Sequence, residues 1–116
     1  MIKTIYIVKY EASQVPSPVK EYLGNYYNIS YCENLETKIR FLRDNSPFDI
    51  KFVWHAKCFH YKEVKKWIQQ MLIPYYHKAN WYQIPHDKIF TLIKGLDNKI
   101  SHLNANYLIE NQRMIR

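Results

Sequence analysis

Residues 26–42 change from two-residue alternation to helical spacing within a few positions, and this change limits the fold more than any other feature of the chain. Residues 26–31 are aromatic, β-branched or small and polar, and Tyr27 and Ile29 fall on one face of a half-buried strand. Asn34 supplies an N-cap oxygen, and the apolar residues that follow recur at helical spacing, namely Leu35, Ile39 and Leu42. The stretch therefore predicts a strand that leads directly into an amphipathic helix.

Hydrophobic spacing also predicts the elements on either side of this stretch. They are strands over 2–9 and 50–57, a helix from about residue 60 to Pro74, a loop over 75–80, an extended piece over 81–84 and a last helix from Pro85 to about Leu103. Pro74 ends the second helix because proline cannot continue it, whereas Pro85 suits the first turn of the last helix.

This order of elements predicts one α/β (α+β) domain over residues 1–103, in which helices flank a small, three-stranded, mostly antiparallel sheet. Residues 104–116 are polar and weakly patterned, and we expect them to form a frayed C-terminal tail. Residues 10–24 carry Pro16, Pro18 and Gly24, which favour a loop longer than a tight hairpin needs.

The composition bears on the kind of partner. Lys and Arg number 17 against 10 Asp and Glu, so the net charge is +7, which favours an acidic partner, either nucleic acid or an acidic protein. The 11 Tyr and 3 Trp exceed the needs of a small core, so we expect exposed rings that can stack on bases. A general bias of the chain toward Tyr, Asn, Ile and Lys explains the same counts equally well.

Other classes of protein are disfavoured by what the sequence does not contain. No apolar run approaches the roughly 18 residues of a membrane helix, so we expect no membrane partner and a cytoplasmic, intracellular location. The 2 Cys and 5 His show no spacing typical of a disulfide scaffold or a zinc site. Lys38 and Arg40 follow a strand end on the first helix, where cations can hold a phosphate or merely form a solvated face.

Several short motifs, taken in order, resemble the GIY-YIG nuclease superfamily over residues 4–93. The motifs are Thr4-Ile5-Tyr6, then Asn28-Ile29-Ser30 with Tyr27 before it, residues 34–39, residues 64–69 and Asn80-Trp81-Tyr82. The chain is most similar to the viral and bacterial branch of that superfamily, whose second motif reads Lys-Ile-Gly and whose last motif reads Glu-Trp-Phe. The resemblance implies a GIY-YIG-like fold and a viral or mobile-element origin.

In such nucleases a tyrosine helps to activate water, an arginine stabilises charge on the phosphate and a glutamate holds a divalent metal. The resemblance places Tyr6 and Tyr27 at tyrosine positions, Lys38 at the arginine, Lys65 at the glutamate and Gln69 at a histidine of the family. Lysine supplies charge without the bidentate geometry of arginine, and an ammonium group repels a metal ion. The resemblance thus implies a degenerate catalytic site with no cofactor.

We therefore expect a catalytically degenerate domain that binds nucleic acid in a basic, tyrosine-lined groove. The residues expected to line it are Tyr6, Tyr27, Lys38, Arg40 and Lys65. At this site the Lys65 ammonium would neutralise the phosphate that a metal otherwise neutralises. The plain structural interpretation is that the tyrosines are half-buried strand residues and that the lysines are solvated.

Two alternatives stay open. The first is an active endonuclease that depends on Mg²⁺ or Mn²⁺, with the carboxylate supplied by Glu33 or by Glu63, the latter only if the alignment of the second helix shifts by two residues. The second is a protein-interaction or inhibitor module that contacts an acidic partner. Its added contact surface would come from the apolar residues of the 10–24 loop, namely Val15, Val19, Tyr22 and Leu23.

Overall fold

The computed structural model of the chain describes residues 2–10, 26–46 and 49–114, except for the side chains of residues 78 and 110–114. The apolar residues of the 10–24 loop that were expected to form a contact surface lie outside this part. None of the described helices is both long enough and apolar enough to cross a membrane.

A five-stranded antiparallel sheet forms the centre of the fold, with the order β3-β1-β2-β5-β4. Its strands are β1 (Lys3–Tyr10), β2 (Tyr26–Cys32), β3 (Ile50–Cys58), β4 (Tyr76–Lys78) and β5 (Trp81–Gln83). The α+β class is confirmed, but the predicted number of three strands is wrong. The first three strands lie close to their predicted bounds, and β4 and β5 add to the edge of β2.

The residues that were expected to form a loop over 75–80 contain β4 and a tight turn. Ala79 and Asn80 connect β4 to β5 with φ angles of 51° and 67°, so both residues lie in the left-handed region. A two-residue hairpin turn of this kind normally carries Asn-Gly or Asp-Gly. Because alanine rarely adopts a positive φ, the sequence gives little sign of this hairpin.

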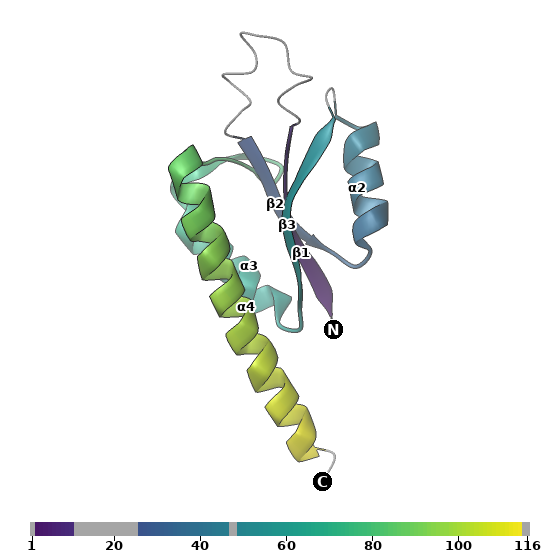
Figure 1. Cartoon of the computed structure of the whole chain (residues 1–116), viewed down its shortest axis with the longest axis vertical. Coiled ribbons are helices and arrows are strands. Elements are labelled where there is room, and N and C mark those ends of the chain that lie inside the picture. The colour runs from purple at the N-terminus through teal and green to yellow at the C-terminus, as the bar shows by residue number, and fades with distance from the viewer. Residues whose placement is uncertain (1, 11–25, 47–48, 115–116) are drawn as a thin grey trace.

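Helices cover both faces of the sheet (Figure 1). The helices are α2 (Leu35–Asp44), α3 (Tyr61–Leu72), the short 3-10 helix η2 (Ile73–Tyr75) and α4 (His86–Met114). The predicted N-cap of α2 is confirmed, since the Asn34 side-chain oxygen accepts a 3.0 Å hydrogen bond from the Thr37 backbone N–H. In Figure 1, α2 lies on one side of the sheet and α3 and α4 lie on the other.

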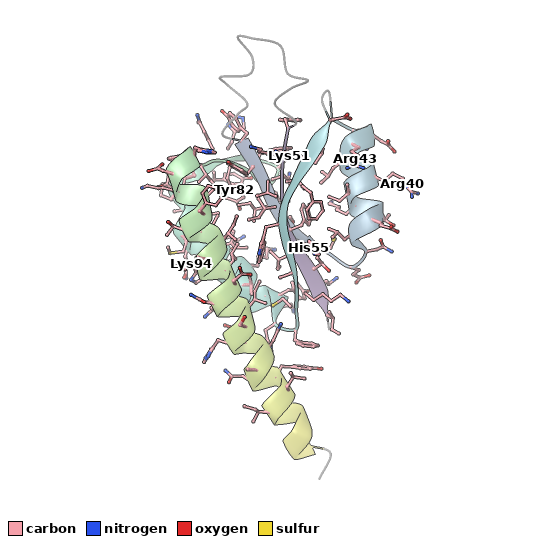
Figure 2. The ribbon with its side chains drawn as sticks, in the orientation of Figure 1. Arg40, Arg43, Lys51, His55, Tyr82 and Lys94 are labelled. Carbon is pink, nitrogen blue, oxygen red and sulfur yellow. The ribbon has the colours of Figure 1, made fainter. Side chains whose placement is uncertain are left out.

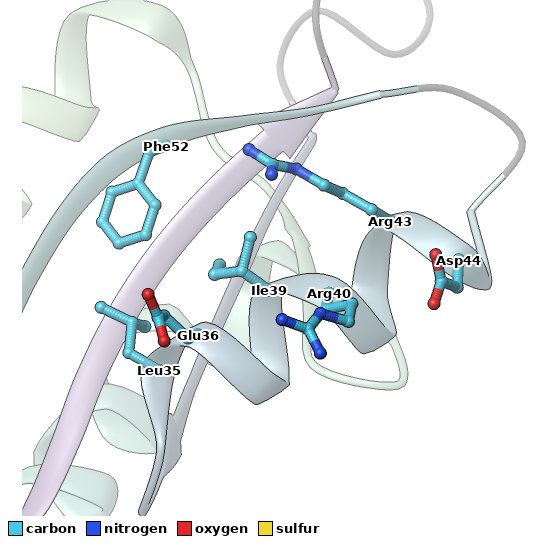
Figure 3. Close-up of a pocket in the computed structure, with 7 residues that line it drawn as sticks. All are labelled: Leu35, Glu36, Ile39, Arg40, Arg43, Asp44 and Phe52. Atoms are coloured by element: carbon cyan, nitrogen blue, oxygen red, sulfur yellow. The ribbon is translucent and has the colours of Figure 1, made fainter.

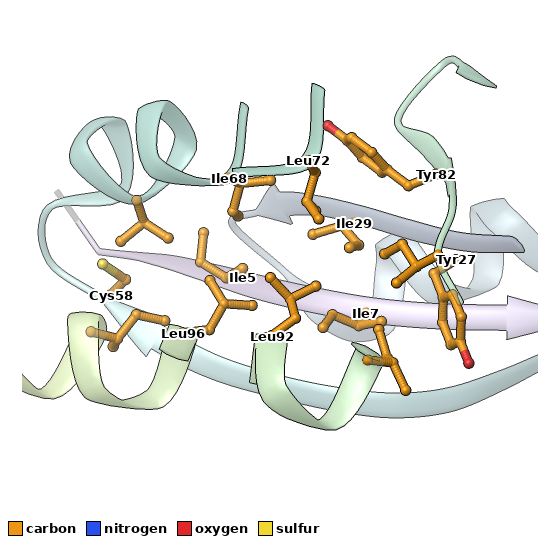
Figure 4. Close-up of a cluster of buried hydrophobic side chains, with 14 residues drawn as sticks. Ile5, Ile7, Tyr27, Ile29, Cys58, Ile68, Leu72, Tyr82, Leu92 and Leu96 are labelled. Carbon is orange, nitrogen blue, oxygen red and sulfur yellow. The ribbon is translucent and has the colours of Figure 1, made fainter. Parts of the chain in front are cut away.

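The core is divided between these two faces. The larger cluster fills the space between the sheet and helices α3 and α4, and includes Ile5, Ile7, Tyr27, Ile29, Ile68, Leu72, Leu92 and Leu96 (Figure 4). The smaller cluster lies beneath α2 and consists of Tyr6, Val8, Ile39 and Ile50. Burial on each face follows the two-residue alternation of the strands.

Helix α4 does not end near Leu103, and residues that were expected to form a frayed tail continue it as far as Met114. Asn104 accounts for this extension. Its Nδ2 donates to the Lys57 carbonyl oxygen and its Oδ1 accepts from the Phe59 N–H, each at 3.1 Å. One turn further along, the Tyr107 ring stacks on Phe59 with 4.3 Å between centroids. Polar and aromatic contacts therefore hold a segment that hydrophobic spacing alone leaves unassigned.

We predict that Asn104→Ala lowers the free energy of unfolding by about 1–2 kcal/mol, because two hydrogen bonds between α4 and β3 are lost together. Denaturant unfolding measures this change. Asn98→Ala is the matched control, since Asn98 is exposed on the same helix and makes no hydrogen bond among the described residues. If the two variants lower the free energy of unfolding equally, the hydrogen bonds of Asn104 with Lys57 and Phe59 do not stabilise the position of α4.

Candidate functional site

The two tyrosines predicted to share a groove lie on opposite faces of the sheet. Tyr6 packs in the cluster beneath α2, whereas Tyr27 packs in the cluster beneath α3 and α4. Their side chains are 1% and 2% exposed, respectively. In the β1–β2 register Tyr6 pairs with Ser30, and Ser30 is three positions from Tyr27, so alternation turns Tyr27 to the other face. The structure therefore does not bring these two rings together.

Tyr6 is also unsuited to deprotonate water. Burial and, to a lesser extent, the nearby Cys32 raise its pKa to about 12, although a hydrogen bond with the Ser30 side chain acts in the opposite direction. At neutral pH the hydroxyl group stays protonated. Burial likewise raises the pKa of Tyr27.

The end of β2 forms an open edge. Strand β5 pairs only with the first residues of β2, as far as Asn28, and the Asn80 carbonyl oxygen then accepts a 3.0 Å hydrogen bond from the Ile29 N–H. No described strand pairs with β2 beyond this point on that side. Because backbone groups alternate along an antiparallel strand, the next outward-facing groups are those of Tyr31.

Lysines approach this edge from both faces of the sheet. On the α3 side, the Lys65 Nζ lies 5.4 Å from the centroid of the Tyr31 ring. On the α2 side, the Lys38 Nζ lies 5.3 Å from the centroid of the Phe41 ring, and its charge is near enough to Cys32 to oppose the effect of burial, which raises the pKa of the thiol. We call this surface, with Tyr31 and Cys32 between Lys38 and Lys65, the β2-edge site.

A third lysine and a second tyrosine adjoin the β2-edge site. The Tyr61 ring lies 4.9 Å from that of Tyr31, and the Lys3 Nζ lies 5.4 Å from the Tyr61 centroid. Lys3 also donates a 2.7 Å hydrogen bond to Glu33. This bond raises the pKa of Lys3 and lowers that of Glu33. The charge of Lys3 is therefore paired within the chain, and that of Lys65 has no ion-pair partner among the described residues.

Helix α3 extends the positive surface along one of its flanks. Val64, Ile68 and Leu72 are buried and form the face of α3 that meets the core. The flank beside Tyr31 carries polar residues within about 100° of one another around the axis, namely Lys62, Lys65, Lys66 and Gln69. All four side chains are exposed. Three lysines of α3 thus share the side that borders the open end of β2.

Residues from each end of the motif series, among them four with polar side chains on the cavity wall, do converge here. Ser30, Lys65, Gln69 and Asn80 line one small cavity of about 30 Å³, together with apolar residues of the core. This volume suits about one water molecule, so it is no substrate pocket. Lys65, which the resemblance assigned to the glutamate position, brings an ammonium group to this cavity.

The two candidate carboxylates do not complete a metal site. Glu63 is exposed on α3, and it is about 200° of rotation from Lys65, away from the β2-edge site. Glu33 is engaged with Lys3. Among the described residues, no three His, Cys, Asp or Glu side chains come together in a group that could hold a metal ion.

Arg40 lies apart from the β2-edge site. It is exposed on the flank of α2 that faces β3, where a groove of about 410 Å³ runs between helix and strand. Figure 3 shows Arg43 extending across this groove toward Phe52, while Ile39 lies at its base. Of the predicted cluster, Lys38 and Lys65 therefore border one edge, and Tyr6, Tyr27 and Arg40 do not join them.

The sequence interpretation did not assign Tyr31, Tyr61, Lys3 and Lys62 to a site. A partial signal existed, because Lys62, Lys65 and Lys66 recur at spacings of three and four residues beside the apolar stripe of the helix. The position of Tyr31 at the open end of β2 depends on how short β5 is, and no local pattern reveals that length.

We predict that Tyr6→Phe makes folding stability less sensitive to alkaline pH. The pKa of Tyr6 is about 12 in the folded protein against an ordinary value of 10.0. Stability from the protonated phenol is complete below pH 10 and is lost as the pH rises toward 12, because the unfolded chain releases this proton first. Unfolding free energies measured between pH 9 and about 11 test the difference in slope. Parallel curves for both proteins would contradict the assignment.

Comparison with protein-family models, with curated proteins and with solved structures finds no match to this chain. The geometry of the β2-edge site and the charges around it are therefore the observations on which a functional proposal rests.

Proposed function

We propose that this chain binds nucleic acid at the β2-edge site and that it does so without cleaving the strand. The observation that carries the proposal is the approach of Lys38 and Lys65 to adjacent residues of one open strand end, from opposite faces of the sheet. Neither ammonium group has an ion-pair partner among the described residues. Two unpaired cations beside an outward backbone N–H form a suitable site for a phosphate.

The surroundings fit a chain of phosphates better than a single small anion. Lys62 and Lys66 continue the positive charge along α3, and Tyr31 and Tyr61 place partly exposed rings beside it. Bases can stack on such rings regardless of sequence, whereas the lysines contact the backbone. The site therefore favours binding with little sequence preference.

Three features support binding without hydrolysis. In the alignment that the resemblance implies, Lys65 takes the position of the metal-binding glutamate, and Glu63 lies about 200° from Lys65 around the axis of α3. Tyr6 is buried beneath α2, on the face of the sheet opposite Lys65, and its pKa of about 12 keeps it protonated at neutral pH. Lys38 supplies positive charge, which holds a phosphate without activating water.

A salt titration with labelled single-stranded and duplex DNA tests this proposal. We expect the double variant Lys38→Gln/Lys65→Gln to weaken binding and to reduce the slope of log Kobs against log salt by about 2, one unit for each lost phosphate contact. The matched control is Lys51→Gln/Lys94→Gln, which removes the same charge from exposed positions on β3 and α4 (Figure 2). The control should change the slope far less.

Each reaction is also run on a denaturing gel with Mg²⁺ and with a chelator. Metal-dependent product that disappears in Glu63→Ala would replace the proposal with an active endonuclease. Equal loss of binding in the two double variants would mean that net charge alone attracts DNA and that the β2-edge site is not the interface. Absence of binding near 0.15 M salt would also reject the proposal, and it would favour a protein partner.

A further inference from the structure

Strand β3 presents a second open edge, on the opposite side of the sheet. It is the first strand in the order β3-β1-β2-β5-β4, so within the described residues it pairs only with β1. Residues 51–57 are all partly or fully exposed. Figure 1 looks onto β3 between α2 and α4, and no described helix or strand lies in front of it.

One end of this edge already binds an amide group. The Asn104 side chain donates to the Lys57 carbonyl oxygen and accepts from the Phe59 N–H, and these are the two bonds that the N–H and carbonyl oxygen of one residue on a neighbouring parallel strand would make. These bonds show that residues 57 and 59 direct their backbone groups outward. By alternation, the N–H and carbonyl oxygen of His55 also point outward, and they have no partner among the described residues.

The side chains along the edge carry positive charge. Strand β3 contains Lys51, His55 and Lys57, all exposed, and no acidic residue. The Phe52 ring is 38% exposed and meets His55 edge to face, with 5.2 Å between centroids. Phe52 therefore offers an apolar contact beside the unpaired backbone of His55.

The groove between α2 and β3 lies next to this edge, on the face that carries Phe52. Its volume of about 410 Å³ is lined by Arg40 and Arg43 and also by the carboxylates of Glu36 and Asp44. Neither arginine forms an ion pair with a described carboxylate. Figure 3 shows the Arg43 side chain directed toward β3, so its guanidinium is available to a carboxylate on an added strand.

We propose that β3 binds an extended acidic peptide segment of another protein, which adds to the sheet as a sixth strand. The backbone of His55 supplies the central hydrogen bonds, Phe52 receives an apolar side chain, and Arg43, Lys51 and Lys57 receive carboxylates. Charge argues for this occupant over a second copy of the chain, because pairing two β3 edges would bring their lysines together. Main-chain bonds provide affinity in this mode, and the side chains select the sequence.

The test uses a synthetic twelve-residue peptide of alternating Glu and Val, blocked at both ends, titrated into the ¹⁵N-labelled full chain. We expect amide shifts and slower hydrogen exchange at residues 50–57, centred on His55. The same peptide with Lys in place of Glu should bind at least tenfold more weakly. His55→Pro should also weaken binding at least tenfold, since it removes an outward N–H that β1 does not use, and proline is tolerated at such edge positions.

Arg43→Glu provides a second variant that leaves the strand backbone intact, and Lys94→Gln on α4 is its control. Arg43→Glu should weaken binding of the acidic peptide several-fold, and Lys94→Gln should not. Shifts confined to β2, equal affinity for the Lys peptide, or unchanged affinity in folded His55→Pro would overturn the proposal. Sedimentation that shows a dimer lost in His55→Pro would assign the edge to a second copy of the chain instead.

Discussion

The pairing of β1 with both β2 and β3 determines where every other part of the molecule lies. Side chains of β1 alternate between the faces of the sheet, so Ile5 and Ile7 enter the core beneath α3 and α4, and Tyr6 and Val8 enter the core beneath α2. The sheet therefore separates two buried clusters. At the edges of the sheet, backbone groups lack partners among the described residues, and α3 brings Lys65 close to the end of β2.

The local parts of this fold are predictable from the sequence. Asn34 provides a cap whose geometry requires only neighbouring residues, and the apolar stripes of α2 and α3 follow helical spacing. The hairpin at Ala79 and Asn80 is different, because its positive φ angles are set by the pairing of β4 with β5 and not by residue preference. The continuation of α4 past Leu103 depends on the contacts of Asn104 with Lys57 and Phe59, which lie 47 and 45 positions earlier in the chain.

In the candidate site too, some features follow from neighbouring residues and others depend on contacts between distant parts of the chain. The sequence identified Lys38 by its place on a helix after a strand end, and it identified Lys65 through the family resemblance. It grouped them with Tyr6 and Tyr27, because motif order does not reveal toward which face a side chain points. The register of β1 against β2 determines the face. Tyr6 pairs with Ser30, and the rings of Tyr6 and Tyr27 therefore lie on different faces of the sheet. The open end of β2 arises because β5 spans only three residues.

Asn104 has a consequence for the integrity of the chain as well as for its shape. A strand edge with unsatisfied backbone groups is a template on which other chains can add, which is the first step of aggregation. The side-chain amide of Asn104 forms hydrogen bonds with the Lys57 carbonyl oxygen and the Phe59 N–H. These two backbone groups are therefore not available to another chain at the edge of β3. Cleavage of α4 just before residue 104 would remove Asn104 and free these two backbone groups, so we expect it to lengthen the edge on which another chain can add.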